Sequence, residues 1–320
     1  MPDTDPRHIL ISLNPKAGRS SSALRAERLQ AILKSHGYIV ELLTDLDEVQ
    51  EKANRLYQAG ELKVLVGVGG DGTAAELTNR TVPGTPITLL PAGTANLIAK
   101  EYRLSPDPKK AARMIEIGET VSLDAGMAGG RLFLVMLTAG IDAHIVEQVH
   151  RNREEAYRRP EGKGGHINYR SYLGPVFRSI RNYTYPLIKI ESCAANQFRL
   201  VSKPVSWAFL FNIPRYGFGT ATTPRCRPDD GLIDLCGFHH RGIVPALLGV
   251  FLSFLGGTHR ISPGYSFAKA EGFRLFPADS SSEPIPYQLD GDPGGNLPVE
   301  IQIVPKRLTL LIWKKKRFFN

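Results

Sequence analysis

A glycine-rich turn between an apolar strand and a helix start constrains the fold of this chain more than any other feature. The strand is expected over Lys63–Val68, and it leads into Gly69-Gly70-Asp71-Gly72-Thr73 and then Ala74-Ala75-Glu76-Leu77. Glycines remove the β-carbons that would hold a polyphosphate away from the backbone, and N–H groups at a helix start attract anions. A carboxylate beside phosphates implies a divalent cation or a hydroxyl between them. The alternative is a tight turn in which Asp71 acts as a helix cap.

Two further turns of similar chemistry also follow strands. Pro91-Ala92-Gly93-Thr94-Ala95-Asn96 comes after the expected strand Ile87–Leu90, and Asn14-Pro15-Lys16-Ala17-Gly18 comes after Ile9–Leu13. All three turns stand at the carboxyl ends of strands, where open α/β sheets bind their ligands. The sequence therefore predicts one phosphate-binding edge built from three turns.

Strands alternate with helical segments from Ile9 to about Ser122. The expected strands are Ile9–Leu13, Tyr38–Leu43, Lys63–Val68 and Ile87–Leu90. Between the second and third of these, Val49, Ala53 and Leu56 recur at helical spacing. This pattern predicts that residues 1–123 form a parallel, doubly wound α/β domain with three layers.

After Asp124 the pattern changes to short alternating runs separated by glycine and proline. These runs are Arg131–Leu137, Tyr185–Glu191, Phe198–Val201, Val205–Phe211, Gly231–Gly237, Phe273–Phe276 and Val299–Val304. Such spacing is typical of antiparallel strands. We expect a second domain over residues 124–304, an antiparallel β-sandwich, followed by a last strand over Leu308–Trp313.

The composition restricts where the protein acts. Three cysteines lack metal-ligand spacing, and the start Met1–Asp5 is neither basic nor apolar, so we expect a cytosolic protein with reduced thiols and no secretory signal. The apolar run Ile243–Leu255 is shorter than the roughly 20 residues that span a bilayer. We therefore expect no transmembrane segment.

Basic residues are in excess, with a net charge of +9. This charge favours an anionic surface, either nucleic acid or acidic lipid headgroups. Basic side chains interleave with tyrosines over residues 151–183 and with aromatic rings over Trp313–Phe319. Such clusters suit a bilayer interface, and the alternative is a solvated run of charges.

The motifs together resemble the diacylglycerol kinase catalytic domain family, which includes bacterial soluble lipid kinases and the sphingosine and ceramide kinases. The resemblance is carried by Asn14-Pro15-x-x-Gly18, by Gly-Gly-Asp-Gly-Thr and by Pro-x-Gly-Thr-x-Asn. It continues through Tyr216–Gly219, Pro224–Asp234 and Gln288–Asp292, so that it covers nearly the whole chain.

This resemblance implies a fold and an activity. The fold is similar to that of NAD kinases and diacylglycerol kinases, with residues 305–320 returning to the first domain. The activity is transfer of the γ-phosphate of ATP, with Mg²⁺, to a lipid hydroxyl, by default that of diacylglycerol to give phosphatidic acid. The family's nucleotide-side pattern falls on Asn14, Lys16, Thr44, Gly69, Gly70, Asp71, Gly72, Thr73, Gly93 and Thr94.

The resemblance also assigns the acidic residues. Asp290 corresponds to the general base that takes the proton of the acceptor hydroxyl, and Asp124 to an Asp that helps to hold the catalytic Mg²⁺ through water. We count Asp71 with these two as a catalytic residue. A structural Mg²⁺ is expected on the Asp230 side chain and the main-chain oxygens of Arg227 and Leu232. Without the resemblance, Asp290 has an alternative interpretation as part of a hairpin turn. For Asp230, an Asx turn before a strand has as much support from the sequence as a metal site.

Two positions depart from the family pattern. Asp292 stands where the family usually has Glu, which leaves its metal or water-network role open, and Leu97 stands where many members have Asp after the Gly-Thr turn. Either the metal and water network tolerates the loss of that carboxylate, or the acceptor site differs from that of the diacylglycerol-specific members.

Two other functions remain as alternatives. An NAD kinase shares the Gly-Gly-Asp-Gly turn, and a non-catalytic regulator would keep the fold to bind nucleotide or lipid. For the kinase, the expected partners are the lipid substrate and an anionic membrane surface touched peripherally, not nucleic acid. A homodimer would be compatible with the sequence, which contains nothing that establishes one.

Overall fold

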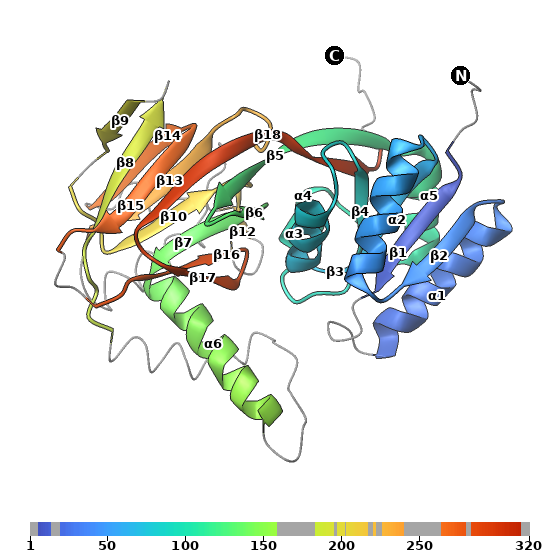
Figure 1. Cartoon of the computed structure of the whole chain (residues 1–320), viewed down its shortest axis with the longest axis horizontal. Coiled ribbons are helices and arrows are strands. Elements are labelled where there is room, and N and C mark those ends of the chain that lie inside the picture. Colours follow the sequence, from blue (N-terminus) through green and yellow to red (C-terminus); the bar gives the residue numbers. More distant parts are fainter. Residues whose placement is uncertain are drawn as a thin grey trace. The chain divides into compact units, whose positions relative to one another are not determined.

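The computed structural model describes residues 6–13, 20–158, 183–194, 197–201, 203–216, 220–221, 226–239, 264–279 and 283–314. The chain divides into two compact units, each with its own core. Unit 1 comprises Met1–Asp124 and Pro305–Asn320, and unit 2 comprises Ala125–Val304. Figure 1 labels their elements along the chain.

Unit 1 is built on a parallel sheet with the strand order β2-β1-β3-β4. The strands are β1 (His8–Leu13), β2 (Ile39–Leu43), β3 (Leu62–Gly69) and β4 (Pro86–Pro91). Seven of the eight residues of β3 are buried, as expected for a central parallel strand covered on both faces.

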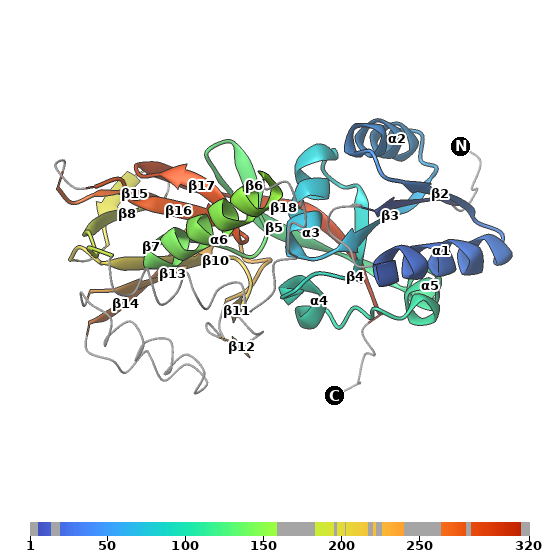
Figure 2. The same ribbon diagram turned by 90° about the horizontal axis from the view of Figure 1, so that it is seen from below.

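Five helices accompany this sheet in the described part of unit 1. They are α1 (Ser20–Ser35), α2 (Leu46–Gln58), α3 (Asp71–Arg80), α4 (Leu97–Glu101) and α5 (Pro108–Ile117). Figure 2 shows α2 and α3 on one face of the sheet and α1 and α5 on the other. The predicted doubly wound α/β fold is thereby confirmed. In α2 the Asp45 side chain caps the first turn, and Val49, Ala53 and Leu56 are buried as their spacing predicts.

Most strands of unit 2 form two sheets with antiparallel pairing, so the predicted antiparallel β-sandwich is also confirmed. One sheet has the order β14-β13-β10-β7-β16-β17. Its strands are β7 (Met136–Gly140), β10 (Trp207–Phe211), β13 (Ile233–Phe238), β14 (Tyr265–Ala270), β16 (Pro286–Leu289) and β17 (Asp292–Asn296).

The other sheet of unit 2 combines β8 (Ile188–Ala194), β9 (Gln197–Leu200), β15 (Gly272–Pro277) and the first part of β18 (Val299–Ile312), with β5 (Glu119–Ala128) and β6 (Arg131–Phe133) paired alongside. Side chains of both sheets share one core cluster, in which Leu137 and Leu210 come from the first sheet and Phe273 and Ile301 from the second. A separate two-stranded ladder joins β11 (Arg215–Tyr216) and β12 (Thr220–Ala221).

The C-terminal strand differs from its prediction. The sequence predicts two strands, over 299–304 and 308–313, whereas β18 is continuous. Its first part pairs antiparallel with β15, and Thr309 pairs parallel with Pro86 of β4. Pro305 and the left-handed Lys306 (φ 53°) interrupt the alternation without ending the strand.

One long helix was not predicted. Helix α6 (Ile141–Arg158) begins directly after β7 and contacts β16 and β17. Its buried residues Ile141, Val146 and Val149 follow a helical spacing that the surrounding β-strand signals obscure. Over the described stretches of the chain, no helix has the length and apolarity needed to cross a membrane.

Candidate functional site

The glycine turn of unit 1 joins β3 to α3. Gly69 ends the strand, Gly70 is the N-cap of the helix, and Asp71 is its first residue. No side chain caps the N-terminus of α3 at Gly70. The first N–H groups of α3 therefore stand at a turn without a capping side chain, which is the arrangement that binds phosphate at helix N-termini.

The turn after β4 lies against this first turn, backbone to backbone. The N–H of Ala92 donates to the Gly69 carbonyl at 2.9 Å. A β-carbon placed on Gly93 would stand 2.7 Å from the Cα of Gly70, closer than real side-chain carbons approach. Gly93 is thus required for the packing of the two turns, and a β-carbon on Gly70 would make a tight contact of 3.1 Å with the Cα of Gly93.

Asp71 fastens the two turns together. Its Oδ2 accepts the N–H of Leu97 and its Oδ1 accepts the N–H of Ile98, both at 2.9 Å. The carboxylate therefore caps α4, a different helix from the one that it begins. Burial raises the pKa of Asp71, while these two hydrogen bonds act in the opposite direction. Leu97 takes part through its backbone, so this contact does not depend on its side chain.

Asn96 shapes the second turn. Its backbone is left-handed (φ 51°), a conformation that Asn tolerates better than most residues. Its Oδ1 accepts the N–H of Gly93 at 3.0 Å, and its Nδ2 donates to the Gly93 carbonyl at 2.7 Å. The Pro-x-Gly-Thr-x-Asn motif is thus a locally closed turn.

Two cations stand near these turns. Arg25 of α1 donates from Nη1 to the Pro91 carbonyl at 3.1 Å, at the start of the second turn. Burial raises the pKa of Asp71, and the positive charge of Lys100 on α4 opposes that rise. Neither residue was predicted from the sequence, because both lie on helices outside the recognised motifs. Thr44 lies exposed after β2, whereas Asn14 and Lys16 fall outside the described residues.

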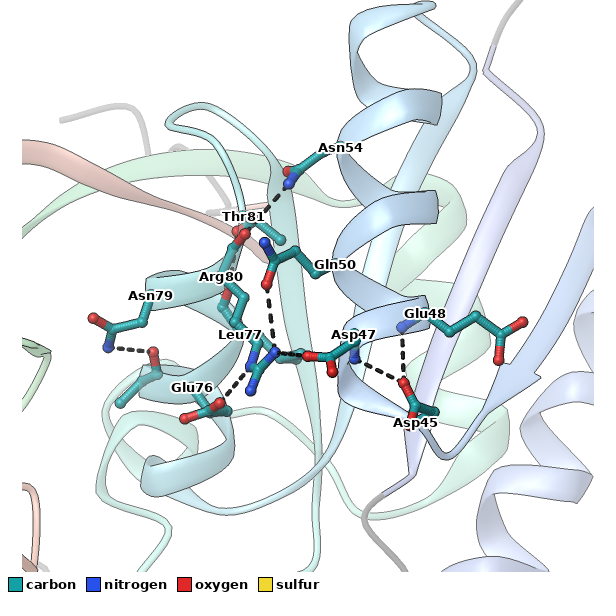
Figure 3. A network of polar contacts seen from close by, with 11 residues as sticks. Asp45, Asp47, Glu48, Gln50, Asn54, Glu76, Leu77, Asn79, Arg80 and Thr81 are labelled. Carbon is teal, nitrogen blue, oxygen red and sulfur yellow. Dashed lines mark hydrogen bonds and ion pairs between the residues drawn. The ribbon is translucent and has the colours of Figure 1, made fainter.

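Helix α3 is held at its far end by two arginines. Figure 3 shows Arg80 between Glu76 of its own helix and Asp47 of α2, with Nε–Oε1 and Nη1–Oδ1 distances of 2.5 and 2.6 Å. Arg307 of β18 donates from Nη2 to the Thr78 carbonyl and, at 2.6 Å, to the Thr81 carbonyl. The C-terminal carbonyls of the helix that carries the glycine turn are thereby satisfied.

Replacing Arg307 by Met should destabilise unit 1 by about 1–3 kcal/mol, because two partly buried carbonyls lose a charged donor. Asp47→Asn is the control. It breaks an ion pair whose acid is 90% exposed, and such pairs contribute about 0–1 kcal/mol. Urea denaturation of both variants tests this ranking, and an equal loss in the two would contradict it.

Asp124 is also buried in unit 1. Its Oδ1 accepts the N–H of Lys306, the left-handed residue of β18, at 2.8 Å. The side chain is 3% exposed. This carboxylate therefore connects β5 to β18 at the boundary of the unit.

The predicted general base, Asp290, stands in a left-handed turn (φ 52°) between β16 and β17 of unit 2. Its carboxylate accepts three backbone N–H groups, those of Leu134 at 2.7 Å, Val135 at 2.8 Å and Met136 at 2.9 Å. Its own N–H donates to the Met136 carbonyl at 3.0 Å. These bonds match the negative charge of a carboxylate and fix its orientation.

Asp292 lies two residues further, about half exposed. Its carboxylate is 3.9 Å from the Arg131 guanidinium and 3.6 Å from Nε2 of His150. The same ring nitrogen lies 3.1 Å from the Gly291 carbonyl. Basic side chains therefore surround Asp292 in this unit.

A polar network beneath the Asp290 turn was missed by the sequence analysis. Asp142 of α6 accepts the hydroxyls of Thr138 and Tyr216, both at 2.6 Å, and the Gln288 amide at 3.5 Å. Gln288 accepts the N–H of Gly291 at 2.6 Å through its Oε1. The segments around Tyr216 and Gln288, which carry two family motifs, meet at this carboxyl. The sequence feature that could have pointed to Asp142 is its position at a strand-to-helix junction.

Asp142→Asn should remove a pH-dependent contribution to stability. Burial raises the pKa of Asp142 despite its three hydrogen bonds. An acid with a raised folded pKa stabilises the fold fully when protonated, and this stabilisation is lost as pH rises from about 4 through the folded pKa.

The free energy of unfolding of the wild type, relative to Asp142→Asn, should therefore fall over that window by up to about 1.4 kcal/mol per pH unit. Urea denaturation at a series of pH values measures this difference. A difference that rises with pH would contradict the assignment.

Asp230, the predicted ligand of a structural Mg²⁺, has a lysine as its partner. Lys269 Nζ lies 2.8 Å from Oδ2 of Asp230 and 3.1 Å from Oδ1 of Asp234. Asp230 Oδ1 also accepts the N–H of Leu232 at 3.2 Å, while Arg227 pairs with Asp229. An ammonium beside these oxygens does not fit a Mg²⁺ site, because it would repel the ion.

The acidic residues thus fall into separate groups. Asp71 and Asp124 belong to unit 1, and Asp230, Asp290 and Asp292 to unit 2. Within the part of the chain that the structure describes, no group of three His, Cys, Asp or Glu residues is arranged to hold a metal ion. The glycine turns of unit 1 are the arrangement most suited to a phosphorylated ligand.

Family comparisons agree with these motifs. The family described as "Diacylglycerol kinase catalytic domain" matches residues 8–128, and that described as "YegS C-terminal NAD kinase beta sandwich-like domain" matches residues 136–312. The chain belongs to the family of the YegS C-terminal NAD kinase beta sandwich-like domain, and its residues 8–128 match the diacylglycerol kinase catalytic domain. The resemblance inferred from its motifs is therefore confirmed. The family match spans both the glycine turns and the Asp290 turn.

Two relatives illustrate the family. A "Diacylglycerol kinase" of Mycobacterium tuberculosis (strain H37Rv) is 25% identical over 315 residues, 93% of each chain. A "Probable lipid kinase YegS-like" of Pseudomonas syringae pv. tomato is 26% identical over 266 residues, 79% of this chain and 77% of the relative.

Solved structures share the fold. A diacylglycerol kinase from Bacillus anthracis str. Sterne matches with a TM-score of 0.63 at 16% identity, over 97% of this chain and 98% of that one. Yeast NADH kinase complexed with NADH matches with a TM-score of 0.52 at 11% identity, over 98% of this chain and 86% of that one. At these identities the likeness concerns the fold alone.

Proposed function

We propose that the protein is an ATP-dependent lipid kinase that transfers the γ-phosphate of MgATP to a lipid hydroxyl, with diacylglycerol as the acceptor and phosphatidic acid as the product. The observation that carries the proposal is the pair of glycine turns at Gly70 and Gly93, packed backbone to backbone in a chain of this family. The acceptor is taken from the name of the M. tuberculosis relative.

The phosphates of ATP would lie over the N-terminus of α3. Several features support this position. Gly70 leaves the helix start without a capping side chain, and the Gly69 and Gly93 backbones lie beside it. Arg25 and Lys100 add positive charge near the turns. Phosphoryl transfer depends mainly on positioning and on charge stabilisation of this kind.

Mg²⁺ would be held through water by Asp71 and Asp124. Both carboxylates already accept backbone N–H groups, so coordination through water disturbs the turns less than direct ligation. Oxygen donors of this type suit the ion, which keeps several of its waters in proteins. When bound, Mg²⁺ would neutralise charge that develops on the phosphates.

Asp290 would take the proton of the acceptor hydroxyl. Three backbone donors hold its carboxylate in one orientation, and an oriented carboxylate can act as a general base when the hydroxyl comes within hydrogen-bond distance. The bonds around Asp142, Gln288 and Gly291 would keep the turn in place from below.

Peripheral contact with an anionic membrane follows from the nature of the substrate. A kinase that acts on diacylglycerol must reach a hydroxyl at the level of the headgroups, and a net charge of +9 favours an anionic surface. The basic residues between 159 and 182, the apolar run Ile243–Leu255 and the basic tail 315–320 fall outside the described residues.

An acceptor panel tests the proposal. The purified protein would receive γ-labelled MgATP with anionic vesicles that contain diacylglycerol, ceramide, a sphingoid base or phosphatidylglycerol, and in a separate reaction with NAD. Label in phosphatidic acid supports the proposal, and label in another lipid keeps the kinase but changes its acceptor. Label only in NAD would show that the protein is an NAD kinase and not a lipid kinase. The absence of label from every acceptor would favour a non-catalytic binding protein.

A further inference from the structure

An ion triad closes one end of the first sheet of unit 2. Lys269 of β14 lies between two carboxylates, with Nζ–Oδ distances of 2.8 Å to Asp230 and 3.1 Å to Asp234. Asp234 is completely buried, while Asp230 and Lys269 are about one-quarter exposed. The proposed reaction of this protein uses none of the three side chains.

The register of the sheet builds this contact. Asp234 of β13 and Lys269 of β14 are directly opposite each other in the antiparallel ladder. Directly opposed side chains in such a ladder are near neighbours. Asp230 stands before β13 and is turned toward the pair by the Leu232 N–H, which donates to its Oδ1. The pairing of β13 with β14 and the residues directly before β13 therefore bring the lysine into contact with both acids.

The charges show why a cation is needed at this position. Two carboxylates in a partly buried place repel each other, and a buried charge is tolerated only with a partner. Lys269 supplies one positive charge against two negative ones. If the ammonium were removed, two carboxylates would lose the cation that they share, and their two negative charges are the charge that a divalent ion balances.

Mg²⁺ and Lys269 exclude each other at these oxygens. Mg²⁺ takes oxygen ligands at about 2.0–2.1 Å in near-octahedral geometry. An ammonium 2.8 Å from Asp230 Oδ2 already occupies the side of the carboxylate that faces Asp234.

We propose that Lys269 is a built-in cation, whose ammonium takes the place of a structural divalent ion at Asp230 and Asp234. Unit 2 therefore needs no metal at this position. Replacing Lys269 by Met, which keeps an unbranched apolar stem, converts the triad into a divalent-ion site.

Counting bound Mn²⁺ by electron paramagnetic resonance tests the proposal in the absence of nucleotide. Lys269→Met should bind one more Mn²⁺ per chain than the wild type, and the double variant Lys269→Met/Asp230→Asn should lose that additional ion. Lys189→Met, on β8 of the same unit, is the matched control and should bind as the wild type does. Equal counts in the wild type and in Lys269→Met would overturn the proposal.

Two further comparisons are made, of which the first does not depend on the folding of Lys269→Met. The wild type and Asp230→Asn should bind the same number of Mn²⁺ ions, because the wild-type site holds no metal. A lower count in Asp230→Asn would overturn the proposal. Thermal unfolding provides the second comparison, since Mg²⁺ should raise the midpoint of Lys269→Met more than that of the wild type. An equal rise in the two would contradict the built-in cation.

Discussion

Asp290→Asn is expected to lower turnover by about 100- to 10,000-fold, which is the usual contribution of a positioned general base. Asn keeps the size of the side chain but cannot take a proton from the acceptor hydroxyl. It also presents an NH₂ group to a cluster of three N–H donors, so we expect a loss of about 1–3 kcal/mol in the free energy of unfolding. Steady-state kinetics with vesicle-borne lipid measure the first effect and urea denaturation the second.

The affinity for ATP separates catalysis from unfolding in this variant. Asp290 belongs to unit 2 and the glycine turns to unit 1, so MgATP binding should remain within about twofold of wild type. Asp47→Asn, which changes an exposed carboxylate of α2, should retain full turnover. A folded Asp290→Asn protein with wild-type turnover would remove Asp290 from its assigned role.

Gly93→Ala should weaken MgATP binding by about 10- to 100-fold. Its β-carbon would stand 2.7 Å from the Cα of Gly70 and 2.9 Å from Oδ1 of Asn96, so the two turns must separate. Overpacking of this kind costs about 1–3 kcal/mol. Each 1.4 kcal/mol by which it destabilises the ATP-bound state weakens the affinity about tenfold. Isothermal titration with MgATP or a non-hydrolysable analogue measures the change.

Gly60→Ala is the matched control for this variant. Gly60 has a positive φ of 73° with no atom within 4 Å of its β-position. Alanine there costs about 1–2 kcal/mol of backbone strain without touching the turns. Gly60→Ala should therefore lose stability and keep its ATP affinity. If both glycine variants bound ATP as the wild type does, the turns would not be the nucleotide site.

The sequence predicted the fold where local signals were strong. The α/β domain was predicted from the apolar strand at 63–68 and from the helical spacing of Val49, Ala53 and Leu56. The β-sandwich was predicted from the short alternating runs after Asp124. Helix α6 was missed because its helical spacing follows directly on a strand pattern. The break at Pro305 and Lys306 split β18 in the prediction, since a kinked strand and two separate strands look alike in sequence.

The sequence identified many of the residues of the candidate site, but it did not predict which of them contact one another. The motif around Asp71 pointed to a phosphate turn or a helix cap, and only the fold shows that its carboxylate caps α4. Lys269 could not be associated with Asp230 because 39 positions separate them and the pairing depends on the register of β13 and β14. Asp142 likewise acquires its partners only through tertiary structure.

Transfer of the terminal phosphate of ATP onto a lipid alcohol is the activity that we propose for this chain. The most direct measurement is mass spectrometry of the lipids after incubation of wild type and Asp290→Asn with γ-¹⁸O-labelled ATP, Mg²⁺ and anionic vesicles that contain diacylglycerol. We expect ¹⁸O-labelled phosphatidic acid with the wild type and almost none with the variant. Unlabelled lipids throughout, from a folded protein that binds ATP, would contradict it.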